Sequence, residues 1–407
     1  NMKYKRSLFL YSLPSIPLTS AQMVVYIIIP SIYSVMPSVG ITVTGFAIMF
    51  ARFTDMVTDP VLGTYLDKLV PKIGWKVWLI LGLPLISFGI YVLLNPIQEF
   101  EIVTLFIGLI AVTLGWTLYS IPWWGIGIAI STNAIKRFQI ISAREILAIP
   151  GVIFGLIIAY LSEMSGEIFL ILSLLFISPL LIKTIPTPEK ENKFSGGYFY
   201  SISFLLKTNH NFKRLCTAYF FIGLSNGLTS VLFILFVNFI IGGSPYFYLL
   251  TYFMSAFIGL PVIYLLVSKI NKNKVWALFM LLACISFMPV SLLNHGDTNL
   301  FLLICIISGF CLGADLTIPA AIQAEIICQA EKDENKILVG KIYSVWSLIQ
   351  KLSLAISAGI SLPLLGYFGF NPSEIEPFIY PLSIAYGVFP IILRLPAIFA
   401  SIYINVD

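Results

Sequence analysis

Apolar residues follow one another in long runs along this chain, and short polar segments separate the runs. About 17 to 25 apolar residues suffice for a helix to cross a bilayer, and each run reaches that length. The pattern therefore predicts twelve membrane-spanning helices. The runs cover residues 8–36, 41–66, 77–95, 102–131, 141–163, 168–184, 213–241, 245–268, 275–294, 299–328, 340–368 and 378–403.

The most polar segment of the chain lies between the sixth and seventh runs. Residues 186–211 contain the charged run Glu189-Lys190-Glu191-Asn192-Lys193 and a Ser-Gly-Gly sequence, which are typical of a linker. We therefore expect an N-terminal six-helix bundle over residues 1–185, a cytoplasmic linker over 186–211 and a C-terminal six-helix bundle over 212–407. The predicted fold class is an all-α membrane protein.

Lys and Arg residues gather in alternate loops of this pattern, and acidic residues occupy the others. The loop after the second run holds Lys68, Lys72 and Lys76, whereas the next loop holds Glu99 and Glu101. Cytoplasmic loops of membrane proteins are enriched in Lys and Arg. The bias predicts a multi-pass protein of the cell (inner, cytoplasmic) membrane with both termini in the cytoplasm.

Composition supports a membrane protein and excludes several other classes. Of the 407 residues, 58% are hydrophobic and 11% are charged, whereas soluble domains carry about 25% charged residues. The net charge of +5 comes from scattered basic residues, so nucleic acid is not an expected partner. All five cysteines lie in apolar runs, which argues against a metal centre or a disulfide framework. Phosphate-binding loops and hydrolase motifs are absent, so we expect no enzyme and no cofactor.

Three charged residues lie within the second apolar run. Arg52, Asp55 and Asp59 follow one another at i, i+3 and i+7, so they share one face of a helix. A charge at the centre of a bilayer costs at least about 2.5–3.5 kcal/mol, so an ion site, a proton relay or a substrate pathway is expected here. The alternative is a structural cluster in which the three charges neutralise one another.

Three stretches of the sequence resemble a known family of transporters. They are residues 51–63 (ARFTDMVTDPVLG), the segment 67–76 and residues 343–351 (YSVWSLIQK). These resemble the glycoside–pentoside–hexuronide:cation symporters, the melibiose-permease-like branch of the major facilitator superfamily. The resemblance implies two six-helix bundles that rock around a central cavity, in a protein that acts as a monomer.

The same resemblance implies roles for the charged residues. Asp55 and Asp59 match the carboxylates that bind the coupling ion, which is Na⁺, H⁺ or Li⁺ in the family; Na⁺ would be the metal if coupling uses sodium. Thr117 matches a hydroxyl position near that ion. Lys351 matches a lysine that couples the ion to the substrate. Arg52 is expected to orient Asp55 in support of this coupling.

Substrate contacts are expected on several of the predicted helices. Trp124 and Arg144 match positions that face the sugar in the family, and Trp124 follows Pro122 in mid-span, where it could act as a stacking platform. The chain departs from the sugar-binding members at Thr19 and Ser120, where those members carry acidic residues. Asp315 lies one turn before Pro319, which could direct it toward the cavity. The predicted substrate-binding residues are Thr19, Tyr119, Ser120, Trp124, Arg144, Asp315 and Trp346.

Other charged residues are assigned to gating or to packing. Asp67 and Lys68 belong to the loop between the second and third spans, which is a gating loop in the superfamily. Glu325 lies near the end of the tenth span, where a gating salt bridge is expected. Arg394 lies near the middle of the last span and is expected to snorkel toward the bilayer surface.

We therefore predict a secondary active transporter that carries a small organic solute, such as a sugar or glycoside, together with Na⁺ or H⁺ by alternating access. Its expected partners are this solute and the lipid bilayer. Within transport, the alternatives are an amphipathic substrate such as a lysolipid and an uncoupled facilitator. A non-transporting membrane receptor is the alternative from another class.

Overall fold

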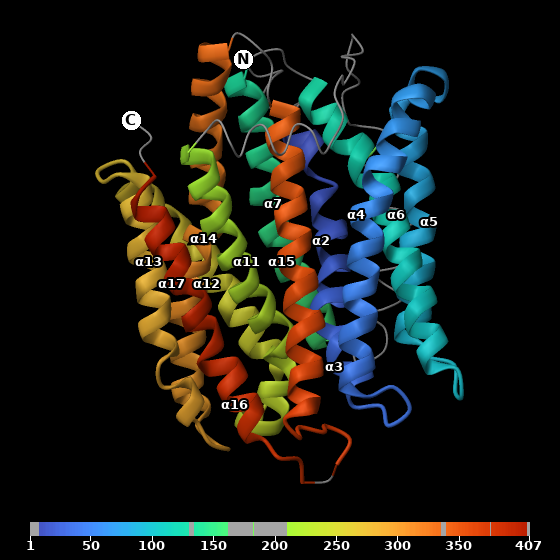
Figure 1. Cartoon of the computed structure of the whole chain (residues 1–407), viewed down its shortest axis with the longest axis vertical. Helices are drawn as coiled ribbons and strands as arrows, with labels where there is room; N and C mark the ends of the chain where they lie inside the picture. Colours follow the sequence, from blue (N-terminus) through green and yellow to red (C-terminus); the bar gives the residue numbers. More distant parts are fainter. Residues whose placement is uncertain are drawn as a thin grey trace. The chain divides into compact units, whose positions relative to one another are not determined.

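The computed structural model describes residues 8–129, 134–161, 182, 210–334, 339–374 and 376–404 (Figure 1). Helices and the turns between them make up these residues, and no β-strand occurs among them. Ten helices of this described part are long and apolar enough to cross a membrane. An eleventh apolar segment, Ile146–Ile157, is shorter. The predicted span 168–184 lies outside the described residues except for residue 182.

The helices follow the predicted runs closely. In the first half of the chain they are α2 (Ser15–Met23), the π-helix η1 (Val24–Ile28), α3 (Ile29–Ser34), α4 (Gly40–Ile73), α5 (Trp75–Leu94), α6 (Glu101–Ala129) and α7 (Ala134–Leu161). In the second half they are α11 (His210–Phe236), the π-helix η3 (Val237–Ile241), α12 (Pro245–Val267), α13 (Lys272–Phe287), the 3₁₀-helix η4 (Val290–Leu292), α14 (Thr298–Glu334), α15 (Val339–Tyr367), α16 (Tyr380–Gly387) and α17 (Phe389–Ile402).

The predicted loop over residues 67–76 is wrong in its extent. Helix α4 continues to Ile73, and the chain turns only at Gly74, whose φ of 88° favours glycine. The hydrophobic run ends near residue 66, but a helix can continue beyond the apolar part of the bilayer with charged side chains. The end of an apolar run therefore marks the end of the membrane span rather than the end of the helix.

The chain divides into two compact units, and each draws segments from both halves of the sequence. The first contains the described residues within Asn1–Gln22, Ala51–Thr208 and Ala324–Leu348. The second contains those within Met23–Phe50, Asn209–Gln323 and Ile349–Asp407. Because the expected linker 186–211 lies almost entirely outside the described residues, the boundaries of the two predicted bundles stay a prediction.

Close packing of α5 against α6 determines which face of α6 is left for other contacts. A methyl group on Gly82 of α5 would lie 2.7 Å from the carbonyl oxygen of Gly115 on α6, and one on Gly89 would lie 2.7 Å from that of Gly108. Small residues at such positions allow two membrane helices to approach closely. Gly108 and Gly115 are seven residues apart, so one face of α6 is committed to α5.

Candidate functional site

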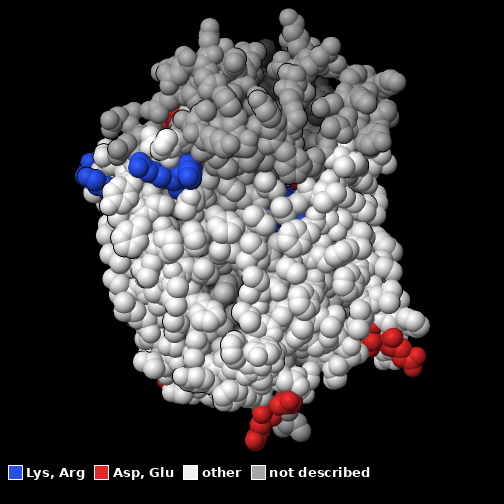
Figure 2. Space-filling view, in the orientation of Figure 1, with Lys and Arg blue, Asp and Glu red and all other residues white. Residues whose placement is uncertain are grey.

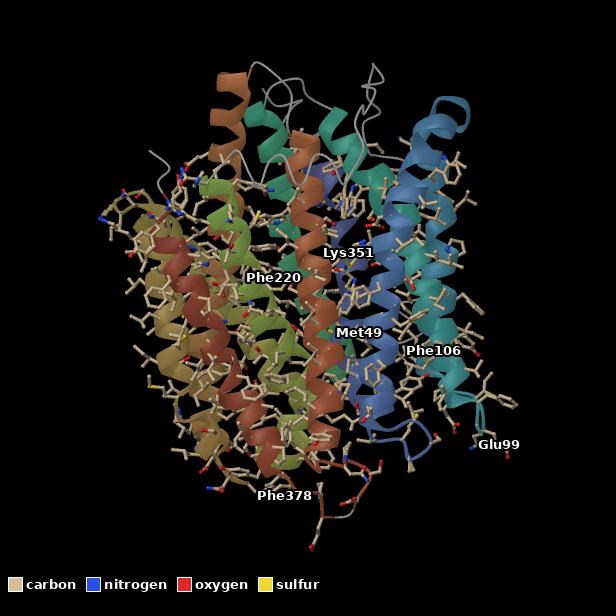
Figure 3. All side chains as sticks on the ribbon, viewed as in Figure 1. Met49, Glu99, Phe106, Phe220, Lys351 and Phe378 are labelled. Carbon is tan, nitrogen blue, oxygen red and sulfur yellow. The ribbon has the colours of Figure 1, made fainter. Side chains whose placement is uncertain are left out.

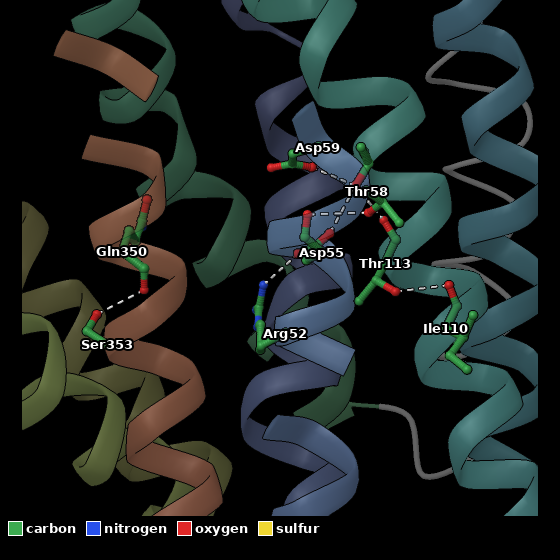
Figure 4. Close-up of polar contacts among 9 residues, drawn as sticks. Arg52, Asp55, Thr58, Asp59, Ile110, Thr113, Gln350 and Ser353 are labelled. Atoms are coloured by element: carbon green, nitrogen blue, oxygen red, sulfur yellow. Dashed lines mark hydrogen bonds and ion pairs between the residues drawn. The ribbon is translucent and has the colours of Figure 1, made fainter. Parts of the chain in front are cut away.

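A cluster of polar side chains joins α4 to α6 within the first unit (Figure 4). Arg52 Nη1 lies 3.3 Å from Asp55 Oδ2, one turn along α4. Thr117 of α6 places its Oγ1 2.9 Å from Asp55 Oδ1 and 2.9 Å from Asp59 Oδ1. Arg52 and Asp55 are 5% and 1% exposed, and Asp59 is half-buried. Two of the three charged residues predicted to share a helix face, Asp55 and Asp59, therefore meet the predicted hydroxyl, and Arg52 contacts Asp55.

The hydroxyl of Thr117 is surrounded by more acceptors than it can serve. Its Oγ1 also lies 3.1 Å from the backbone carbonyl oxygen of Thr113. A threonine hydroxyl carries one hydrogen, and ionised carboxylates only accept hydrogen bonds. At any moment, therefore, at least two of these three neighbouring oxygens face Thr117 Oγ1 without receiving its hydrogen. An added proton or cation would stabilise such a group of oxygens.

The net charge of Arg52, Asp55 and Asp59 also favours an added proton or cation. Arg52 contributes one positive charge, and Asp55 and Asp59 contribute two negative charges when both are ionised. These three side chains together then carry one net negative charge, which a single proton or monovalent cation would neutralise. Hard oxygen donors from carboxylate, hydroxyl and carbonyl groups suit hard cations of this kind.

Thr117 and Trp124 lie on the same face of α6. Thr117, Ser120 and Trp124 are spaced i, i+3 and i+7, on the side opposite the glycine face that packs on α5. With a rise of about 1.5 Å per residue, Trp124 lies about 10 Å along the axis from Thr117. Helix α6 continues through Pro122 without a break.

Two adjacent tryptophans hold the guanidinium of Arg144, which α7 contributes to the first unit. The Arg144 Cζ atom lies 5.5 Å from the ring centroid of Trp123 and 5.5 Å from that of Trp124. A guanidinium this close to an aromatic face is attracted by the electrons of the ring. The predicted substrate residues Trp124 and Arg144 are therefore brought together, with Arg144 9% exposed and Trp124 half-buried.

Trp123 is fixed by a residue that the sequence did not single out. Tyr11 donates its hydroxyl to the Trp123 carbonyl oxygen at 3.0 Å, and the Trp123 indole donates to the Tyr11 carbonyl oxygen at 3.1 Å. The rings of Tyr11 and Tyr119 also contact Trp123, with centroids 5.8 and 5.5 Å away. Reciprocal bonds between residues 112 positions apart leave no local signal in the sequence, which explains why Tyr11 was missed.

Two buried hydroxyls of α6 lie next to this aromatic group. Tyr119 Oη and Ser120 Oγ make no hydrogen bond within the described residues, although both side chains are fully buried. A buried polar group without a partner costs about 1–3 kcal/mol. Thr19 differs, because its Oγ1 lies 2.7 Å from the Ser15 carbonyl oxygen and 3.1 Å from that of Ala148, which holds α2 against α7.

Asp315 belongs to a separate polar network inside the second unit. Its Oδ1 accepts a hydrogen bond of 3.0 Å from Trp276 Nε1 of α13, and its Oδ2 lies 3.3 Å from Arg394 Nη1 of α17. Asp315 is 3% exposed. Helix α14 continues through Pro319 without a break. The residue predicted to bind substrate or a proton is therefore engaged by two side chains from other helices.

Arg394 does not reach the bilayer surface, so the expectation of snorkelling is wrong. Beyond its ion pair with Asp315, it donates from Nε to Ser225 Oγ at 3.2 Å and from Nη2 to Asn226 Oδ1 at 2.7 Å. The side chain is held inside the unit because Asp315 and α11 offer it acceptors. The sequence gives no indication of this pair, since the two charges lie 79 positions apart on α14 and α17.

The other predicted site residues lie on α4, α14 and α15. Lys351 is 6% exposed on α15 and lies in the second unit (Figure 3), so its predicted coupling to the carboxylates stays a prediction. Glu325 of α14 and Trp346 of α15 are half-buried in the first unit. Asp67 and Lys68 lie on α4, but their side chains fall outside the described part of the structure.

Comparison with known proteins establishes the family. A family model described as MFS/sugar transport protein matches residues 10–407. No curated protein sequence gives a significant match.

Two solved structures show the same fold. One is a variant of the Escherichia coli fucose:proton symporter FucP, with 16% identity, 99% of this chain and 98% of that chain covered, and a TM-score of 0.58. The other is FucP, a major facilitator superfamily transporter, in its outward conformation, with the same identity and coverage and a TM-score of 0.56. The helices therefore adopt the fold of two helical bundles that defines this superfamily. The chain is an integral membrane transporter rather than an enzyme, and it belongs to the MFS/sugar transport protein family.

Proposed function

We propose that the protein carries a small organic solute, a sugar or glycoside, across the membrane together with Na⁺ or H⁺. The observation that supports coupling most is the group of oxygens around Thr117, which favours an added positive charge between Asp55 and Asp59. The family description favours a sugar as the solute. The sequence over residues 51–63 favours the glycoside–pentoside–hexuronide branch of the superfamily.

Cation binding would control the shape of the site through α6. A cation held by Asp55, Asp59 and Thr117 draws α4 and α6 together, and Trp124 lies two turns further along the same face of α6. The orientation of this helix therefore links the cation to the aromatic residues. The resemblance to the symporters implies that Lys351 competes with the cation for the carboxylates.

The aromatic residues supply the proposed contacts for a sugar. Ligand sites combine apolar and aromatic walls with a few polar groups that set orientation. Trp123 and Trp124 would contact the apolar face of a sugar ring, and Arg144 would donate to its hydroxyls. Tyr119 and Ser120 offer hydroxyls that make no hydrogen bond within the described protein, which a sugar hydroxyl approaching α6 could satisfy.

Alternating access completes the proposed mechanism. The cation and the sugar together would favour the conformation that closes around them, after which the two bundles expose the site to the other side. The distribution of Lys and Arg supports an orientation in the cell membrane with both termini in the cytoplasm.

An amphipathic substrate is the second candidate. Thr19 occupies a position where the sugar-binding members carry an acid, and its hydroxyl is committed to the carbonyl oxygens of Ser15 and Ala148. Ser120 stands in place of the second acid. Fewer carboxylates near the aromatic residues means fewer acceptors for sugar hydroxyls, which favours a lysolipid. Thermal unfolding of the protein with a lysophospholipid or a sugar separates the two candidates, because only a compound that binds the folded protein stabilises it.

Thermal unfolding of the purified protein tests the cation site directly. A ligand that binds only the folded state stabilises it by about 2.7 kcal/mol at a hundredfold excess over its Kd. We expect Na⁺ or a lowered pH to stabilise the wild type but not the Asp55→Asn/Asp59→Asn variant. Glu376→Gln, which removes an exposed carboxylate elsewhere, serves as the control and should respond like the wild type. Equal responses in all three proteins would contradict the proposed site.

A further inference from the structure

Basic side chains gather at one end of the second unit, outside the site described above. The five residues of this basic cluster come from the start of α11 and from the turn between α12 and α13, where Figure 2 shows Lys and Arg atoms on the surface. They are Lys213, Arg214, Lys269, Lys272 and Lys274. All are exposed except Lys272, which is half-buried.

No described acidic residue of the second unit balances this charge locally. Asp315 is paired with Arg394 inside the unit. Asp297 precedes α14, and Glu374 and Glu376 lie between α15 and α16, so these residues are separated from the basic cluster by the length of a membrane helix. The cluster is therefore a concentrated patch of positive charge.

Hydrogen bonds to the end of α17 hold the parts of the basic cluster in a fixed arrangement. Arg214 Nη1 donates to the carbonyl oxygen of Tyr403 at 2.6 Å. Asn273 Nδ2 donates to the carbonyl oxygens of Ile402 and Ile404 at 3.3 and 2.8 Å. These donors satisfy carbonyl groups that a helix end leaves without partners. The starts of α11 and α13 are thereby tied to the same helix end.

The start of α13 adds to the positive potential. Its N-cap, Asn271, makes no side-chain capping bond, and the positive end of the helix dipole lies among Lys269, Lys272 and Lys274. The turn that carries these lysines is itself ordered by backbone bonds, since the N–H groups of Lys269 and Ile270 donate to the Leu266 carbonyl oxygen at 3.0 and 2.9 Å.

The basic cluster lies where lipid headgroups are expected. The candidate membrane spans Pro245–Val267 and Lys272–Leu292 end and begin at the turn that carries it. Large apolar and aromatic side chains are exposed on the last turns of the neighbouring helices, including Tyr264 and Leu265 of α12 and Phe399 of α17. Acyl chains could lie along these side chains while a headgroup contacts the lysines.

We propose that the basic cluster binds the phosphate headgroup of an anionic phospholipid, whose acyl chains pack on the exposed ends of α12 and α17. Basic residues beside transmembrane helices recognise anionic lipids by charge. The bound lipid bridges the starts of α11 and α13 and so stabilises the second unit. This binding is independent of the transported solute and of the coupling ion.

Lipid titration of the purified full-length protein tests the proposal. Phosphatidylglycerol is added to the protein in detergent, and its apparent affinity is read from the rise in thermal stability, with phosphatidylcholine as the uncharged comparison. Each lysine near a charged surface contributes about 1 kcal/mol, or about fivefold in affinity. The triple variant K269Q/K272Q/K274Q should therefore bind phosphatidylglycerol on the order of 100-fold more weakly.

A charge-preserving variant separates loss of binding from loss of folding. K269R/K272R/K274R should keep the affinity of the wild type, and neither triple variant should change the thermal stability measured without lipid. Equal affinity of the wild type and K269Q/K272Q/K274Q would overturn the proposal, as would equal stabilisation by phosphatidylcholine. Equal stabilisation by inorganic phosphate would also overturn it, because the site would then recognise the ion rather than a lipid.

Discussion

Replacing Asp315 with leucine removes the carboxylate that faces Arg394 across the second unit. Arg394 keeps two neutral acceptors, Ser225 and Asn226, but loses its counter-ion at 3.3 Å, and Trp276 loses its hydrogen-bond acceptor. At an effective dielectric constant of about 20, two unit charges 3.3 Å apart attract each other by about 5 kcal/mol. Measured losses for breaking one side of a buried pair are about 3–5 kcal/mol. We therefore expect Asp315→Leu to lower the free energy of unfolding by about 3–5 kcal/mol.

The double variant Asp315→Leu/Arg394→Met should be more stable than either single variant. Buried pairs can often be replaced by apolar residues at little cost, because the desolvation of both charges disappears with the charges. The remaining losses are the Trp276 indole, which is left without an acceptor at a cost of about 1–3 kcal/mol, and the half-buried Asn226 amide oxygen, which loses the Arg394 donor.

Unfolding of the purified variants in mixed micelles, followed by circular dichroism, measures these differences. Ser308→Ala on the same helix is the control, because this buried hydroxyl bonds only to backbone of its own helix and its loss should cost about 1 kcal/mol or less. If the losses of the two single variants simply add in the double variant, the two charges do not interact and our reasoning is refuted.

Three further predictions concern the first unit. Thr117→Val removes the hydroxyl between two carboxylates, and because hydrogen bonds to charged groups contribute about 1.5–3 kcal/mol, the cation concentration that gives half-maximal thermal stabilisation should rise about 10- to 150-fold. An unchanged concentration would contradict the site. Trp124→Ala removes one of the rings that contact Arg144, so the KM for sugar uptake should rise while the affinity for the cation stays the same; loss of both would indicate misfolding. Gly115→Ala places a methyl group 2.9 Å from the Gly82 carbonyl oxygen, and equilibrium unfolding should show a loss of about 1–3 kcal/mol, whereas no loss would mean that α5 and α6 are not tightly packed.

The sequence predicts the helices well because the bilayer imposes a length and an apolar character on each of them. The positions of Arg52, Asp55 and Asp59 on one face of α4 follow from helical spacing alone. Their meeting with Thr117 required the resemblance to known symporters, since 58 positions separate Asp59 from Thr117. Hydropathy identified the apolar part of α4 but missed its continuation to Ile73, because charged residues are tolerated in a helix outside the apolar part of the bilayer.

The sequence could not predict which residues of distant helices pair with one another. Arg394 was expected to seek the bilayer surface, because nothing near it along the chain could satisfy its charge, yet Asp315 does so from α14. The contact between Tyr11 and Trp123 was missed for the same reason. Periodicity reveals which face of a helix is polar, but only packing reveals which polar face it meets.

Sugar uptake into proteoliposomes, driven by an imposed gradient of Na⁺ or H⁺, tests most directly whether Asp59 and its neighbours couple the cation to the solute. A panel of radiolabelled pentoses, hexoses and disaccharides identifies a transported sugar, and wild type is then compared with Asp59→Asn. We predict that the wild type accumulates the sugar above its external concentration until an ionophore abolishes the gradient. Asp59→Asn should exchange sugar across the membrane but not accumulate it. Accumulation by Asp59→Asn equal to that of the wild type would contradict coupling at this site.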